Sequence, residues 1–205
     1  MLPEQFALLG SLLASAGGFY YLYCTIKGTV QPNKITWFFW GAFPMIAFAA
    51  QLAQGVGFVL WATFAAGFTP FLIVLAASFN KEAYWEIKRQ DYLFAAIGII
   101  GVVLWQVTDE PNLALTFALI ADLAVAWPTI AKSFTNPETE DWKAFAFGSI
   151  GFLIALLSVQ VWTYENYAFV GYLFVVNTLI MILAARKSTT TPEERHLSED
   201  SESHL

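Results

Sequence analysis

Three polar side chains lie deep inside apolar stretches of the sequence: Asp122, Asn177 and Thr69. An aspartate at the centre of a membrane helix costs about 2.5–3.5 kcal/mol on insertion scales, so Asp122 is expected to face the protein interior. Burial disfavours the charged form of a carboxyl, which makes Asp122 a candidate for taking up and releasing a proton. We therefore predict that these three side chains bind a substrate, with proton coupling through Asp122.

Each of these residues also has a structural interpretation. Asp122 could accept a hydrogen bond from a serine or threonine of a neighbouring helix. Asn177 could link two helices, a contact that contributes about 0.6 kcal/mol on average. Pro44, Pro70 and Pro128 each remove a helical hydrogen bond and are predicted as hinges, although prolines are frequent in membrane helices in general.

Four tryptophans inside apolar stretches could stack on a planar solute or a sugar: Trp40, Trp61, Trp105 and Trp127. Aromatic residues make up 17% of the chain. At that abundance they more often pack the interior or anchor a membrane interface.

The sequence predicts neither an enzyme nor a metal or cofactor site. Hydrolysis would need paired carboxylates, a Ser/His pair or a metal cluster, and Asp122 is the only acid well inside an apolar stretch. Both histidines, His196 and His204, lie in the polar tail. A retinal protein would need a lysine inside the last span, and no lysine lies inside any span predicted below. We expect no nucleic acid partner.

The composition indicates a membrane protein. The chain is 58% hydrophobic and 13% charged, whereas soluble domains average about 25% charged residues. A membrane span needs about 20 mostly apolar residues. Lipid-facing segments must satisfy their own backbone hydrogen bonds, so we predict an all-α fold. Seven spans are expected, at 6–26, 35–53, 56–78, 92–107, 113–131, 142–161 and 167–185.

The charge distribution predicts the orientation of these spans. In the seven-span arrangement the 10 Lys and Arg residues all fall on one side of the membrane. By the positive-inside rule the N-terminus lies outside and the C-terminus in the cytoplasm. We expect the protein to lie in the lipid bilayer of a bacterial cytoplasmic (inner) membrane. The sequence leaves open whether it forms a homo-oligomer.

Two parts of the sequence resemble each other. Thr25 aligns with Thr129 and Thr69 with Asn177, at an offset that grows from 104 to 108 residues, and Trp37 aligns with Trp142 between them. A chance likeness between two sets of apolar helices is the alternative. Two three-span units face the same way only if a further span lies between them. This gives a 3+1+3 plan, with the halves related by an axis along the membrane normal.

The predicted organisation follows from this plan. Residues 1–80 form the first three-helix repeat, 81–108 a cytoplasmic loop and linker helix, and 109–187 the second three-helix repeat. Residues 188–205 are polar and acidic, and are predicted to form a disordered cytoplasmic tail.

These features resemble the SWEET and PQ-loop transporters, which share the seven-helix 3+1+3 plan and its orientation. Their mark is a Pro-Gln pair near the inner end of each repeat's first helix. Here Pro128 stands at the second such site, followed by Thr, and Cys24 replaces the first proline. Pro44 matches a central proline of the second helix, and Asn177 matches a substrate-contacting asparagine. Proton-coupled amino acid exporters of this group use an acid in the helix that holds Asp122.

The function predicted from the residues and the resemblance is a small-solute transporter that works by alternating access. Its solute would be polar: a sugar, an amino acid or a similar metabolite, with PnuC-type vitamin transporters sharing the plan. Both glutamines and half of the expected prolines are absent, so sugar specificity is not implied. The alternative is a non-transporting membrane receptor or assembly subunit with the same bundle.

Overall fold

The computed structural model describes residues 2–53, 60–83, 85–108 and 111–186, and within these ranges the chain is helical and without strands. This confirms the predicted all-α class. The seven α-helices are α1 (Phe6–Lys27), α2 (Lys34–Ala53), α3 (Leu60–Phe79), α4 (Arg89–Val107), α5 (Pro111–Thr135), α6 (Trp142–Leu157) and α7 (Tyr164–Ala185), and a 3-10 helix, η1 (Pro137–Thr139), precedes α6.

Each helix falls on a predicted span, with differences at the ends. The sixth span was expected to reach residue 161, but α6 ends at Leu157 because Ser158 closes it. The Ser158 N–H bonds the carbonyls of Ile154 and Ala155, and its hydroxyl bonds the Ile154 carbonyl. Conversely, α5 continues four residues beyond the predicted end at 131. The predicted tail, 188–205, lies outside the described residues.

Polar residues fix the helix ends at one end of the bundle, which we call the basic end because Lys27 and Lys34 lie there. Gly28 ends α1 in the left-handed region, with φ 72°, where glycine carries no Cβ penalty. The Asn33 side chain accepts hydrogen bonds from the first turn of α2. Asp141 accepts one from the first turn of α6. Both carboxamide and carboxylate oxygens are preferred partners for these unpaired N–H groups.

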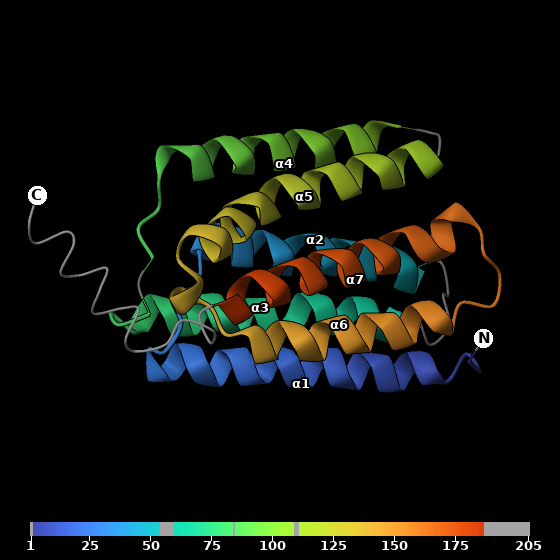
Figure 1. Ribbon diagram of the computed structural model, residues 1–205. Helices are drawn as coiled ribbons and strands as arrows, with labels where there is room; N and C mark the ends of the chain where they lie inside the picture. Colours follow the sequence, from blue (N-terminus) through green and yellow to red (C-terminus); the bar gives the residue numbers. More distant parts are fainter. Residues whose placement is uncertain (1, 54–59, 84, 109–110, 187–205) are drawn as a thin grey trace, which may run out of the picture.

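Helix α3 lies against both α1 and α2, and α7 lies against both α5 and α6 (Figure 1). We call α1–α3 and α5–α7 the two triplets. The triplets meet at two seams, one between α1 and α6 and the other between α2 and α5. Helix α4 packs on α5 and α2, and in Figure 1 it lies at the edge of the bundle opposite α1.

The two seams are built differently. At the α1–α6 seam the backbones touch through glycine: a Cβ on Gly151 would lie 2.5 Å from the Gly10 carbonyl oxygen. A Cβ on Gly17 would lie 2.6 Å from the Ala144 carbonyl oxygen. At the α2–α5 seam a side chain makes the link, because the Thr36 hydroxyl donates to the Val125 carbonyl oxygen at 2.7 Å.

The bundle has an apolar outside and a partly polar inside. Large apolar side chains such as Leu12, Phe79 and Val107 are 68%, 83% and 70% exposed, while Thr25 and Thr129 are fully buried. Two helical stretches, Phe6–Lys27 and Asn166–Ala185, are long and apolar enough to cross a membrane. Thr63–Phe79 and Trp142–Leu157 are apolar but shorter.

Substitution of Gly151 by alanine is expected to lower the thermal unfolding temperature in detergent. The new methyl group would meet backbone atoms of α1, which cannot move aside, so overpacking should cost about 1–3 kcal/mol. Gly171→Ala is the matched control, because a Cβ there meets only a Leu156 methyl carbon at 3.9 Å. An unfolding temperature of Gly151→Ala equal to that of the control would contradict the close α1–α6 contact.

Candidate functional site

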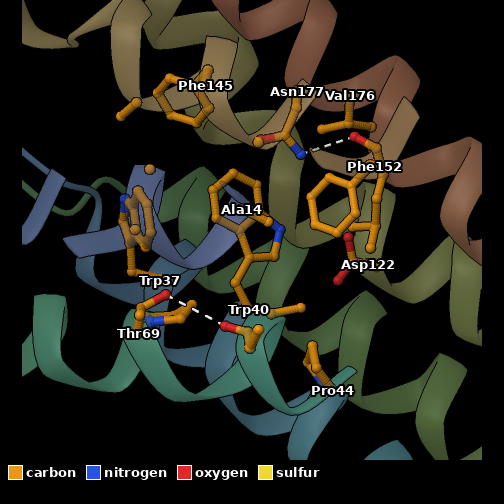
Figure 2. Close-up of a pocket in the computed structure, with 18 residues that line it drawn as sticks. Ala14, Trp37, Trp40, Pro44, Thr69, Asp122, Phe145, Phe152, Val176 and Asn177 are labelled. Carbon is orange, nitrogen blue, oxygen red and sulfur yellow. Dashed lines mark hydrogen bonds between the residues drawn. The ribbon is translucent and has the colours of Figure 1, made fainter. Parts of the chain in front are cut away.

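A cavity of about 100 Å³ lies between the two triplets, with lining residues from every helix except α4. It collects the three predicted substrate-binding residues, Asp122 from α5, Asn177 from α7 and Thr69 from α3, near the middle of their helices (Figure 2). The predicted hinge residues Pro44 and Pro70 also line it. The third, Pro128, is buried elsewhere in α5, toward the basic end.

Asp122 is 3% exposed, and the described side chains beside its carboxylate are neutral. The Tyr172 hydroxyl donates to Oδ2 at 2.6 Å, and the indole of Trp40 lies nearby (Figure 2). The structural alternative, a bond from a serine or threonine of a neighbouring helix, is therefore replaced by a bond from a tyrosine on α7.

Asn177 and Thr69 each lie against a glycine of a neighbouring helix. The Asn177 amide donates to the Leu173 carbonyl of its own helix at 2.8 Å, and a Cβ on Gly148 would lie 2.5 Å from its Oδ1. The Thr69 side chain lies against Gly18 in the same way. Any larger residue at these glycines would displace the polar side chain opposite.

Aromatic rings form much of the remaining wall: Trp37 and Trp40 from α2, and Phe145 and Phe152 from α6. The Trp37 ring centroid lies 5.2 Å from that of Trp40 and 6.4 Å from that of Phe145. The sequence singled out Trp40 but missed the other three rings.

The other tryptophans that could have stacked on a solute lie elsewhere. The side chains of Trp61 and Trp127 are 50% and 51% exposed on the outside of the bundle, and the side chain of Trp105 lies outside the described residues. The periodicity of a fully apolar helix gives no sign of which face is internal.

A layer of buried side chains lies between the cavity and the basic end. About one helical turn beyond Gly18, Asp122, Thr69 and Asn177 in that direction lie four buried side chains: Tyr21, Val125, Ile73 and Ile180. None of the four is more than 1% exposed.

Beyond this layer lies an ion pair that the sequence analysis missed. Lys132 Nζ and Glu140 Oε1 are 2.5 Å apart, with side-chain exposures of 1% and 0%. The Tyr21 hydroxyl donates to Glu140 Oε2 at 2.6 Å, and Lys132 also donates to the Gln31 carbonyl oxygen. The Trp85 ring covers the ammonium group at 4.9 Å. The group ties α1, the α1–α2 turn, α5 and the loop before α6 together.

Lys132 lies just beyond the predicted fifth span, in the last turn of α5. Burial lowers the pKa of its ammonium group, while the charge of Glu140 acts in the opposite direction. The ion pair therefore depends on both partners, because either charge alone would be buried without compensation.

Lys132→Met and Glu140→Gln are each expected to destabilise the protein by about 3–5 kcal/mol, the usual cost of leaving one buried charge unpaired. The double variant should lose less stability than the sum of the losses in the two single variants, because it leaves no unpaired charge in the interior. Thermal unfolding in detergent measures both effects, and Lys143→Met, at an exposed lysine, is the control. Additive losses in the double variant would argue against a coupled pair.

No protein-family model, curated protein or solved structure matches the chain.

Proposed function

We propose that the chain is a membrane carrier that moves a small solute through this cavity by alternating access. The observation that carries the proposal is the place of the cavity: it lies between two helix triplets, at mid-height, with polar groups from both. Carriers of repeated build place their solute site at that position. A non-transporting receptor or assembly subunit would be expected to fill this space with side chains.

The surface supports placing all seven helices in the bilayer. Large apolar side chains face outward on each helix, for example Leu9 on α1, Leu75 on α3, Ile100 on α4 and Ile182 on α7. A continuous apolar exterior of this kind is rare in soluble monomers. With the lysines of the turns at one end, the positive-inside rule makes the basic end cytoplasmic.

The spacing of the helix ends that flank the α1–α2 and α5–α6 connections supports the 3+1+3 plan. Helices α1 and α5 end at Lys27 and Thr135, which are 108 positions apart, and α2 and α6 begin at Lys34 and Trp142, also 108 apart. On this register Thr69 corresponds to Asn177, as the sequence alignment had it. Trp37, however, corresponds to Phe145 and not to Trp142.

Contacts between the triplets follow the same register. Residues on a twofold axis should touch their own counterparts, and two such pairs do. The Gln31 N–H donates to the Thr139 carbonyl at 2.9 Å, and the Trp37 and Phe145 rings lie 6.4 Å apart. We take these contacts, with the resemblance to SWEET and PQ-loop transporters, as support for two repeats around α4.

The proposed cycle begins from a state closed to the cytoplasm. The layer that contains Tyr21 and Val125 and the Lys132–Glu140 pair both lie between the cavity and the basic end. Opening toward the cytoplasm would have to part Tyr21 on α1 from Glu140 before α6. A change in the charge of Asp122 alters the hydrogen bond from Tyr172 of α7 and the surroundings of Trp40 on α2, so protonation there can bias which end opens.

Asp122→Asn is expected to abolish proton-coupled transport. An amide fills the same space but cannot bind and release a proton in this range. The measurement uses proteoliposomes with a pH-sensitive dye inside, challenged with sugars, amino acids and amines under an imposed pH gradient. The wild type should show solute-dependent proton flux, and the variant should show less than about a tenth of it, as expected for loss of an essential proton site.

Asp141→Asn is the matched control, because asparagine caps a helix as well as aspartate does and this residue lies outside the cavity. If Asp122→Asn keeps wild-type proton flux, coupling through Asp122 is wrong. If the wild type moves none of the solutes tested by any readout, carrier function itself is contradicted.

A further inference from the structure

We infer that the cavity takes a small monovalent organic cation of the alkylammonium class, held by the Asp122 carboxylate and the faces of the surrounding aromatic rings. This rests on the proposed function, since it names the substrate class of the same site. Three properties of the cavity carry the inference: its charge, its walls and its size.

The charge of the cavity is unbalanced. Among the lining residues that the structure describes, Asp122 is the one charged side chain. Its hydrogen-bond donor, Tyr172, is neutral and occupies one of the carboxylate's roughly four acceptor positions, and the neighbouring Trp40 is neutral as well. The nearest buried cation described, Lys132, is paired with Glu140 on the far side of the buried layer. A bound cation would supply the missing charge, whereas a bound anion would meet repulsion.

The walls suit a cation with an apolar surface. Four rings line the cavity, and Figure 2 shows those of Trp40 and Phe152 beside Asp122. The negative face of an aromatic ring attracts ammonium groups, and tryptophan does so best. Aromatic cages with an acid are the usual way proteins bind quaternary ammonium groups.

The polar groups are too few for a sugar. The Asn177 amide is already bonded to the Leu173 carbonyl, and the Thr69 hydroxyl points to the Ala65 carbonyl at 3.5 Å. A bound sugar would leave several hydroxyl groups without partners in a mostly apolar site, which is costly.

The size of the cavity sets the scale of the bound group. A cavity of about 100 Å³ is of the same order as the roughly 150 Å³ apolar cavity known to admit benzene. It therefore has room for one compact group such as trimethylammonium or tetramethylammonium.

The test compares choline with 3,3-dimethyl-1-butanol, its neutral isostere, in which a carbon replaces the charged nitrogen. Purified full-length protein in nanodiscs is titrated with each compound and with tetramethylammonium, using calorimetry and thermal shift. The two cations should bind at least about tenfold more tightly than the neutral isostere, because only they neutralise Asp122 and gain from the rings. Equal binding of choline and its isostere, or binding of neither, overturns the inference.

Two pairs of variants locate the site. Asp122→Asn should weaken choline binding at least about tenfold, while Asp141→Asn should leave it unchanged. Trp40→Leu should weaken it more than Trp40→Phe, which keeps a ring face. If the Asp122→Asn variant fails to fold, the comparison of choline with its neutral isostere on the wild-type protein still tests the inference.

The inference and the proposed function can fail separately. Tight, Asp122-dependent choline binding without uptake into proteoliposomes would refute the carrier and keep the cation site. Uptake of a neutral solute by a protein that does not distinguish choline from its isostere would refute the cation site and keep the carrier.

Discussion

A carboxylate buried inside an apolar bundle needs hydrogen-bond donors from other helices, because burial without them is costly. Asp122 imposes this constraint on the bundle. Its hydrogen-bond donor is the Tyr172 hydroxyl of α7, and the indole of Trp40 on α2 lies beside it. One side chain of the second triplet thereby has neighbours in both triplets at mid-height. Gly18 and Gly148 line the cavity and leave room for the side chains of Thr69 and Asn177, which a Cβ at either glycine would displace.

Two of the buried acidic side chains, Glu140 and Asp122, have opposite surroundings. At Glu140 the negative charge is balanced by Lys132, and the pair joins segments that are far apart in the sequence. At Asp122 only neutral donors approach among the described residues. A balanced pair favours a closed, stable contact, whereas an unbalanced carboxylate favours an incoming proton or cation. Lys132 and Glu140 thus form a structural ion pair, whereas the described side chains beside Asp122 carry no compensating charge.

Much of the fold could be predicted because apolar run length and turn residues determine helix limits in such a sequence. Asp122, Asn177 and Thr69 lie at similar depths within their apolar runs. Those depths were enough to predict that the three side chains would line one cavity. The lining rings could not be chosen in the same way: Trp40 and Trp127 both lie in apolar helices, yet one faces inward and the other outward. That choice depends on the neighbouring helices, which the local sequence does not encode.

The buried ion pair was beyond prediction for a related reason. Glu140 lies in a short polar stretch that reads as a solvent-exposed turn, and its burial depends on Tyr21, 119 residues earlier. Under the proposed two-repeat plan, the ends of α1 and α5 and the starts of α2 and α6 favour a register that pairs Trp37 with Phe145 and not with Trp142.

The unequal seams have a mechanical consequence. The backbones of α1 and α6 touch at glycines. This close contact opposes separation of the two helices but allows small rotations of one against the other. Along α2 and α5 a single threonine hydroxyl bridges to a carbonyl, a bond that water could replace. If the two triplets rotate relative to each other, the rotation axis is expected to lie near the α1–α6 seam. The distance between α2 and α5 should then change more than the distance between α1 and α6, and spectroscopic labels on these helices would measure the difference.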